Sequence, residues 1–310
     1  MNILFIASVN NPFHATNGGT QRSALLLNAL SQIANVDVIS FCTEDVLSSE
    51  SYNIIHQEIW VNPEKDGRRK KFRRLLTPWK PDTIYVVDKH KEQVVDDAVA
   101  AKKYDYIVIR YMPMAIECGL WKYEDILVID IDDNPIDRVL ADAVAAKSLR
   151  NKVYLRLYAR SLEIALDRVQ KNTRLVYVSN PDDCNGKAIY LPNVPFYSVG
   201  EKSTKIEIPN RMVFVGDLGY WANIQGITYF LDMIYPKIQK VIPEIELHLV
   251  GRIWNEELKT QWEKNKGVVV TGFVPCLVDE YAEAQVAVIP IYYGAGTCIK
   301  VLEKVRQAMV

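Results

Sequence analysis

Residues 212–252, MVFVGDLGYWANIQGITYFLDMIYPKIQKVIPEIELHLVGR, decide the fold, because they contain one strand, one helix and a second strand. The first apolar run ends in a turn at Gly216, a loop continues through Asn223, and helical periodicity begins at about Gly226. The helix residues expected in the core recur at helical spacing: Ile227, Phe230, Leu231, Ile234 and Ile238. A strand, a helix and a strand in this order favour a parallel α/β sheet.

The same alternation runs through the rest of the chain. The predicted strands are residues 2–9, 36–42, 106–111, 126–131, 174–178, 212–216, 246–251, 268–271 and 286–290. Most of these runs are continuously apolar, which is typical of strands that helices cover on both faces. We therefore expect an α/β protein with two Rossmann-like, doubly wound domains.

A change of composition indicates the domain boundary. Residues 180–210, NPDDCNGKAIYLPNVPFYSVGEKSTKIEIPN, are rich in proline and small polar residues. We expect an amino-terminal domain over residues 1–195, a linker over 196–210 and a second domain over 211–310. Ligands of such sheets bind at the carboxyl ends of the strands, so we expect a cleft there between the domains.

Composition excludes several classes of protein. The net charge of -1 gives no general attraction to nucleic acid. The five cysteines are widely spaced and form no C-x-x-C pair, so they suggest neither a disulfide framework nor a zinc knuckle, and a reducing cytoplasm fits best. No apolar run approaches the roughly 18 residues of a membrane helix. The opening MNILFIASVNNPF lacks the basic start of a signal peptide and is read as a buried strand.

One basic cluster stands out, because every position from Arg68 to Arg74 except Phe72 is Arg or Lys. The favoured interpretation is a solvated surface segment. The alternative is a patch that contacts an anionic membrane surface, and the apolar residues nearby keep that peripheral contact open.

Glycines open a helix soon after the first strand. In NGGTQRSALLLNAL, Gly18 and Gly19 precede the buried stripe of that helix, and N–H groups at such a helix start can hold an anion. The alternative is an ordinary turn into a helix. The pattern is not G-x-G-x-x-G, which disfavours a dehydrogenase-type dinucleotide site.

An acidic group follows the fourth predicted strand in ILVIDIDDNPIDRV. Asn134 and Pro135 predict a helix start, which places Asp130, Asp132 and Asp133 near the carboxyl end of the strand. Grouped carboxylates raise at least one pKa and suit proton transfer or hydrogen bonding to a hydroxyl. The alternatives are ordinary strand-end aspartates, or a chelated metal that no histidine or second carboxylate motif supports.

A second glycine turn opens the last predicted helix, in GAGTCIKVLEKV. The apolar residues expected to face the sheet are Cys298, Leu302, Val305 and Met309. Thr297, Lys300 and Glu303 then share the other side. The helix start and Lys300 suit a diphosphate, and Glu303 suits two ribose hydroxyls. The alternative is an exposed Lys300–Glu303 ion pair.

Four segments in order, FVGDLGYWANIQGITYF, PEIELHLVGR, VVVTGFV and AQVAVIPIYYGAGTCIKVLE, resemble the carboxyl half of retaining GT-B glycosyltransferases of the group 1 or family 4 type. The resemblance implies transfer of a sugar from a nucleotide diphosphate sugar to a glycan or lipid-linked acceptor, with retention of configuration. It implies no metal and no other cofactor, and a role in polysaccharide biosynthesis. The carboxyl domain would bind the nucleotide and the amino domain the acceptor.

By this resemblance Glu303 holds the ribose, and Gly296 and Thr297 line the diphosphate. Lys300 stabilises the leaving group as the catalytic lysine of a G-x-G-T-x-x-K-x-x-E pattern. The remaining positions are Gly18, Gly19 and Gly216 around the donor, and Asp132 and Asp133 as catalytic carboxylates near the sugars. Arg22 and Arg252 are further candidates, or else surface ion-pair partners.

Two departures from the family leave alternatives open. Ala295 stands where many relatives carry an acidic residue, and the chain stops at Val310 inside the helix that bears Glu303, so we expect a truncated second domain with an unpaired edge. The other candidates are a non-catalytic glycosyltransferase-like subunit and a nucleotide-sugar epimerase of the same fold.

Overall fold

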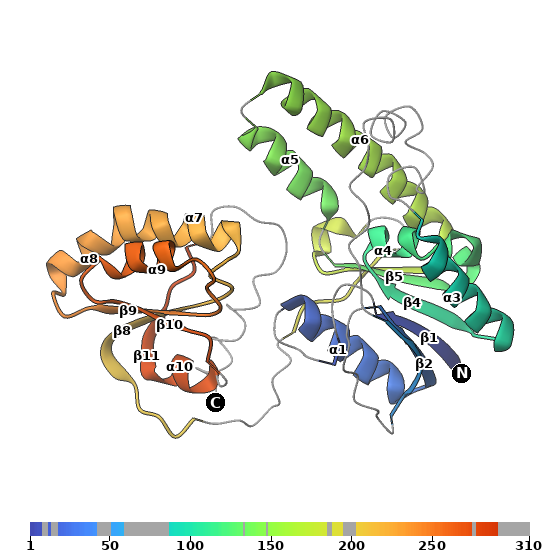
Figure 1. Cartoon of the computed structure of the whole chain (residues 1–310), viewed down its shortest axis with the longest axis horizontal. Coiled ribbons are helices and arrows are strands. Elements are labelled where there is room, and N and C mark those ends of the chain that lie inside the picture. The colour runs from blue at the N-terminus through green and yellow to red at the C-terminus, as the bar shows by residue number, and fades with distance from the viewer. Residues whose placement is uncertain are drawn as a thin grey trace. The chain divides into compact units, whose positions relative to one another are not determined.

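The computed structural model describes residues 1–7, 12–13, 18–41, 51–58, 87–132, 134–146, 148–184, 188–194, 203–274 and 277–290. The chain forms two compact units that divide after Phe196. Each unit is an α/β layer structure with a parallel sheet, as the alternation of the sequence predicts (Figure 1).

The amino-terminal unit contains a seven-stranded parallel sheet in the order β3-β2-β1-β4-β5-β6-β7. Its strands are β1 (Asn2–Ala7), β2 (Asn35–Ser40), β3 (Asn53–Gln57), β4 (Tyr106–Arg110), β5 (Leu127–Asp132), β6 (Leu175–Val178) and β7 (Ala188–Tyr190). The α-helices described are α1 (Gly18–Ser31), α3 (Lys89–Ala101), α4 (Met112–Glu117), α5 (Pro135–Ala145) and α6 (Leu149–Asn172). Short 3-10 helices span Leu120–Ile126 and Pro181–Asp183.

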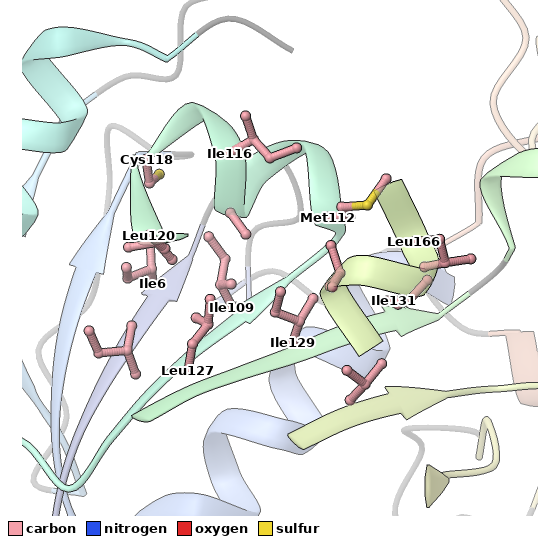
Figure 2. Packing of buried hydrophobic residues seen from close by; sticks show 14 of the residues in the cluster. Ile6, Ile109, Met112, Ile116, Cys118, Leu120, Leu127, Ile129, Ile131 and Leu166 are labelled. Atoms are coloured by element: carbon pink, nitrogen blue, oxygen red, sulfur yellow. The ribbon is translucent and has the colours of Figure 1, made fainter. Parts of the chain in front are cut away.

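The central strands of this sheet, β1, β2, β4 and β5, are buried on both faces. In β1, Leu4 and Ile6 belong to the core on one face, whereas Ile3 and Phe5 belong to the core on the other. Figure 2 shows the first of these cores, where Ile6 and its neighbours on β4 and β5 pack beneath α4 and α6. Burial of each such side chain contributes about 1.5–3 kcal/mol, which explains the continuously apolar strands.

Helix α5 begins as the sequence predicts. The Asn134 side chain accepts a hydrogen bond from the N–H of Ile136, and Pro135 occupies the first turn. Helix α6 is unusual, because its buried residues all lie from Ala159 onward. In Figure 1 the pair α5 and α6 extends beyond the sheet that α6 covers.

The carboxyl-terminal unit contains a four-stranded parallel sheet in the order β10-β9-β8-β11. Its strands are β8 (Ile208–Val215), β9 (Glu246–Val250), β10 (Val268–Gly272) and β11 (Ala284–Ala287). Its helical segments are α7 (Trp221–Tyr229), a π-helical turn (Phe230–Ile234), α8 (Tyr235–Val241), α9 (Glu256–Glu263) and α10 (Leu277–Glu283). The apolar stripe predicted for α7 and α8 packs in the core, which confirms its helical period.

Helix α7 begins earlier than predicted, at Trp221 instead of about Gly226. The prediction took Asn223 as a loop residue, but its side chain donates a hydrogen bond to the carbonyl of Asp217 at 2.7 Å and so satisfies the turn from within the helix. Within the described residues, no helix combines the length and apolar character required to cross a bilayer.

Candidate functional site

The first candidate site lies at the carboxyl ends of β1 and β4, which are neighbours in the sheet. Chain order reverses between these two adjacent strands, and in open α/β sheets ligands bind at the carboxyl end of such a reversal. Helix α1 begins at Gly18, β4 ends at Arg110 and β5 ends at Asp132. These three ends meet through a buried network of charged side chains.

Arg22, in the second turn of α1, binds Asp130 through two hydrogen bonds. Its Nε lies 2.7 Å from Asp130 Oδ2 and its Nη2 lies 2.8 Å from Oδ1. Its Nη1 donates to the carbonyl of Leu191 at 2.9 Å and to Asn193 Oδ1 at 2.8 Å. Arg22 therefore connects α1 to β5 and to the segment that follows β7. The interpretation of Arg22 as a surface ion-pair partner was wrong, because its side chain is buried.

Arg110 provides the second cation of this network. Its Nε donates to Asp130 Oδ2 at 2.9 Å, and a second nitrogen binds Asp132. Its remaining nitrogen donates to the carbonyl of Gly19 and, at 3.0 Å, to Ser23 Oγ. Arg110 therefore fixes the start of α1 against the ends of β4 and β5.

Asp132 and Tyr111, which follows β4 and donates its N–H to the Asp130 carbonyl, both have positive φ, 61° and 68°. Non-glycine residues adopt this region at a cost of about 1–3 kcal/mol, and such strain often marks functional positions. Ser179 donates from its Oγ to the Asp132 carbonyl at 3.0 Å, and Asn193 Nδ2 lies 3.3 Å from Asp132 Oδ1. These contacts hold Asp132 in its strained conformation.

The network balances two carboxylates against two guanidinium groups. Burial alone lowers the pKa of Arg22, but its hydrogen bond to Asp130 and the charges of Asp130 and Asp132 outweigh burial and raise the pKa. We predicted repulsion among the aspartates, but the structure gives Asp130 and Asp132 arginine partners, which attract instead. In helix α5, desolvation and then the charge of Asp183 raise the pKa of the Asp137 carboxyl group.

Asp183 also lines a pocket of about 280 Å³ beside the end of β5. Its polar lining is acidic and amide-rich, which suits hydroxyl groups of a ligand. The lining residues are Ile131, Asn134, Ile136, Glu163, Leu166, Asp167, Gln170, Val178 and Asp183.

The second candidate site lies at the carboxyl ends of β8, β9 and β10, where glycines follow or end each strand. The Gly216 N–H donates to the Val250 carbonyl at 2.9 Å, and the Gly251 N–H donates to the Gly272 carbonyl at 2.8 Å. A Cβ on Gly251 would lie 1.7 Å from the Gly216 carbonyl oxygen. Gly251 is thus packed tightly against the Gly216 carbonyl, with no room for a side chain. Beyond them the Arg252 guanidinium lies 5.3 Å from the centre of the Phe273 ring.

Of the positions assigned a role by the resemblance, the structure describes four: Gly18 and Gly19 at the start of α1, Asp132 at the end of β5, and Gly216 after β8; it also describes the further candidates Asp130, Arg22 and Arg252. The others lie outside the described residues: Asp133, Gly296, Thr297, Lys300, Glu303 and the basic run from Arg68 to Arg74.

Sequence reasoning assigned no role to Arg110, Ser179 or Asn193. Arg110 left a signal, because a charged residue inside the apolar run YIVIR is costly to bury without a partner. Parallel register then places Arg110 directly beside Asp130.

Residues 209–309 match the family model described as "Glycosyl transferases group 1". A curated relative is the "Uncharacterized 44.6 kDa protein in cps region" of Klebsiella pneumoniae, which is 24% identical over 330 residues, 99% of this chain and 81% of the relative.

Solved structures with similar folds include three synthases. The sucrose-phosphate synthase of Thermosynechococcus elongatus has a TM-score of 0.59 at 14% identity, with 97% of this chain and 78% of that chain covered. A trehalose-6-phosphate synthase has a TM-score of 0.57 at 9% identity, with 99% and 81% covered. The UDP-forming α,α-trehalose-phosphate synthase of Burkholderia xenovorans has a TM-score of 0.54 at 10% identity, with 99% and 82% covered. The chain therefore has the GT-B fold, and its residues 209–309 are a group 1 glycosyltransferase domain.

Proposed function

We propose that this protein is a retaining glycosyltransferase that moves a sugar from a nucleotide diphosphate sugar to a glycan or lipid-linked acceptor in polysaccharide biosynthesis. The match of residues 209–309 to the group 1 family carries this proposal. A relative in a cps region supports the polysaccharide context. A structural neighbour that forms UDP and was solved with glucose-6-phosphate supports a nucleotide sugar donor and a sugar acceptor.

The chemistry requires stabilisation of a departing diphosphate, because the transition state separates an oxocarbenium-like sugar from that leaving group. We propose that Lys300, with the helix start at Gly296 and Thr297, supplies positive charge to the phosphates, and that Glu303 accepts hydrogen bonds from the ribose. In this mechanism no metal ion or other cofactor takes part.

The amino-terminal network supports a positioning role for the arginines. Arg110 holds the Gly19 carbonyl, so the first N–H groups of α1 are fixed where a helix start can face an anion. The Asp132 side chain is 11% exposed, so part of the carboxylate stays accessible although it binds arginine. We propose that Asp132 and the adjacent Asp133 accept hydrogen bonds from sugar hydroxyls at the carboxyl edge of the sheet.

Replacement of Glu303 by alanine is expected to weaken binding of the cognate nucleotide sugar by about 10–150-fold. This range corresponds to loss of hydrogen bonds to a charged group worth about 1.5–3 kcal/mol. Calorimetric titration with a panel of nucleotide sugars measures the change. Glu256→Ala, at an exposed glutamate in the first turn of α9, is the matched control and should bind as the wild type does.

Equal affinity of the Glu303→Ala and wild-type proteins would contradict the ribose assignment. Absence of binding to any nucleotide sugar would favour the non-catalytic subunit instead. Incorporation of radiolabelled sugar into an acceptor, as opposed to conversion of the free nucleotide sugar, separates the transferase from an epimerase.

We further propose that the protein contacts the inner face of an anionic membrane from the cytoplasm, where lipid-linked acceptors are found. The start of α6 supports this contact. Leu149 is 77% exposed and repeats with the exposed Val153 and Leu157 on one helix face, while Arg150 and Arg156 are exposed nearby. Exposed apolar residues beside arginines suit an anionic lipid surface. The basic run from Arg68 to Arg74 would add to this attraction.

Replacement of both Val153 and Leu157 by aspartate is expected to reduce binding to phosphatidylglycerol vesicles by about 10-fold or more, because two apolar anchors are lost and two negative charges are added. Co-sedimentation with vesicles measures binding. Val241→Asp, at an exposed valine of α8, is the control for an added charge elsewhere. Wild-type binding by the double variant, or equal binding to neutral phosphatidylcholine vesicles, would contradict this contact.

A further inference from the structure

A cluster of possible metal ligands lies away from both sites described above, at the β3 edge of the amino-terminal sheet. His56 lies in β3, Glu58 follows that strand, and His90 lies in the first turn of α3. One ligand atom from each of the three side chains lies within 4.8 Å of the other two. The chain has four histidines, so this small edge gathers half of them.

The distances within the cluster suit a first-row metal. Glu58 Oε2 lies 2.7 Å from His90 Nε2 and 3.5 Å from His56 Nε2. A tetrahedral zinc ion holds its nitrogen and oxygen ligands at about 2.0–2.2 Å, which puts them about 3.3 Å apart. The two observed separations bracket that value. Two histidines and one carboxylate that leave a coordination position open are an established ligand set for zinc.

An orphaned nitrogen provides independent support. His56 Nε2 is buried from solvent and has no hydrogen-bond partner within the described part of the chain. The Glu58 carboxylate oxygen lies 3.5 Å from it, a separation that meets the limit for an ion pair but forms no hydrogen bond. A buried polar atom without a partner is costly and requires an explanation. A metal ion bound between His56 and Glu58 would satisfy this nitrogen.

Hydrogen bonds fix the main chain at two of the three ligand residues. The Glu58 N–H donates to the Ser40 carbonyl at 2.8 Å, which holds Glu58 against β2. The His90 N–H donates to Asp88 Oδ1 at 2.9 Å in the N-terminal cap of α3. The nearby cation Lys91 is paired with Glu117, so its charge is compensated.

We propose that His56, Glu58 and His90 form a binding site for one divalent transition-metal ion, with zinc as the preferred occupant. The ion would join positions 58 and 90, which are 32 residues apart, and would tie the edge strand β3 to the start of α3. This site takes no part in the proposed sugar transfer, so the two proposals succeed or fail separately.

Calorimetric titration of the EDTA-treated, dialysed full-length protein with zinc chloride tests the site. One ion should bind per chain. His90→Ala should lower the affinity for zinc by about 100-fold, because loss of an outer-shell hydrogen-bond partner alone lowers metal affinity by about 10–100-fold and His90 would be a direct ligand. His90 is largely exposed, so this variant should keep its fold, which circular dichroism verifies. Glu58→Gln, which preserves shape and removes the charge, should give a similar loss.

His248→Ala is the matched control. His248 Nε2 lies 3.3 Å from Glu246 Oε2 on β9, with the same two-residue spacing as His56 and Glu58, but no third ligand joins this pair among the described residues. This variant should bind zinc as the wild type does. Cobalt(II) titration should give visible bands without thiolate charge-transfer absorption, because the ligands are nitrogen and oxygen atoms.

Three results would overturn the proposal. They are no stoichiometric zinc binding by the wild type, unchanged binding by both His90→Ala and Glu58→Gln, and a thiolate band on cobalt that assigns the metal to cysteine.

Discussion

Replacement of Arg110 by methionine is expected to lower the free energy of unfolding of the amino-terminal domain by about 3–5 kcal/mol, because it leaves buried carboxylates without one of their two cations. Asp130 would retain only Arg22, and Asp132 would lose its strongest partner. The change also removes the hydrogen bond that holds the Gly19 carbonyl. Typical domains are stable by about 5–15 kcal/mol, so this loss is a large fraction of the total stability. Urea unfolding followed by circular dichroism measures the loss.

Arg160→Met is the control, because Arg160 pairs with Glu163 at 2.6 Å but is 72% exposed. Exposed pairs of this kind contribute at most about 1 kcal/mol. A double variant with Arg110→Met and Asp132→Asn should recover part of the loss, since one uncompensated charge disappears. Equal stability of the Arg110 and Arg160 variants would show that the buried network does not stabilise the domain.

Replacement of Gly251 by alanine is expected to destabilise the carboxyl-terminal domain by at least about 3 kcal/mol, beyond the ordinary range for single substitutions. The new Cβ would lie 1.7 Å from the Gly216 carbonyl oxygen, and the φ of 146° is itself unfavourable for an L-residue. The ends of β8 and β9 would have to separate, which breaks the 2.9 Å hydrogen bond from the Gly216 N–H to the Val250 carbonyl. Thermal unfolding of the full chain measures the effect.

Gly272→Ala is the matched control, because Gly272 also has a positive φ of 80° but its Cβ would meet no atom within 4 Å. Only the backbone cost of about 1–2 kcal/mol then remains. If the two variants unfold at the same temperature, the close approach of Gly251 to Gly216 does not constrain residue 251, and the expected extra loss of stability is wrong.

The fold was predictable wherever burial leaves a strong pattern. Strands covered on both faces must be apolar throughout, so the central strands were recognised, and the cap at Asn134 was read from two adjacent residues. Strands β3 and β7 were missed because edge strands pair on one side only. The NIIHQ of β3 is half polar, and the three residues of β7 lie in proline-rich sequence.

The candidate site was predictable only in part. The sequence indicates that Gly18 and Gly19 open a helix and that Asp132 lies near a carboxyl strand end. It does not show that Arg22 binds Asp130, because these residues are 108 positions apart and meet only once the strand order is known. Side-chain partners that depend on long-range register are beyond local patterns, and the assignment of the aspartates as mutually repelling failed for that reason.

Cys118 sits fully buried in the core that Figure 2 shows, and burial raises the pKa of its thiol far above the usual range. Alkylating reagents attack the thiolate, so the Cys118 thiol does not react while the core is folded. The exposed Cys184 is accessible to the same reagents. Modification of Cys118 therefore requires the surrounding core to open first. The rate at which Cys118 is alkylated therefore reports how often the core of the amino-terminal domain opens, and mass spectrometry can follow that rate at a native residue.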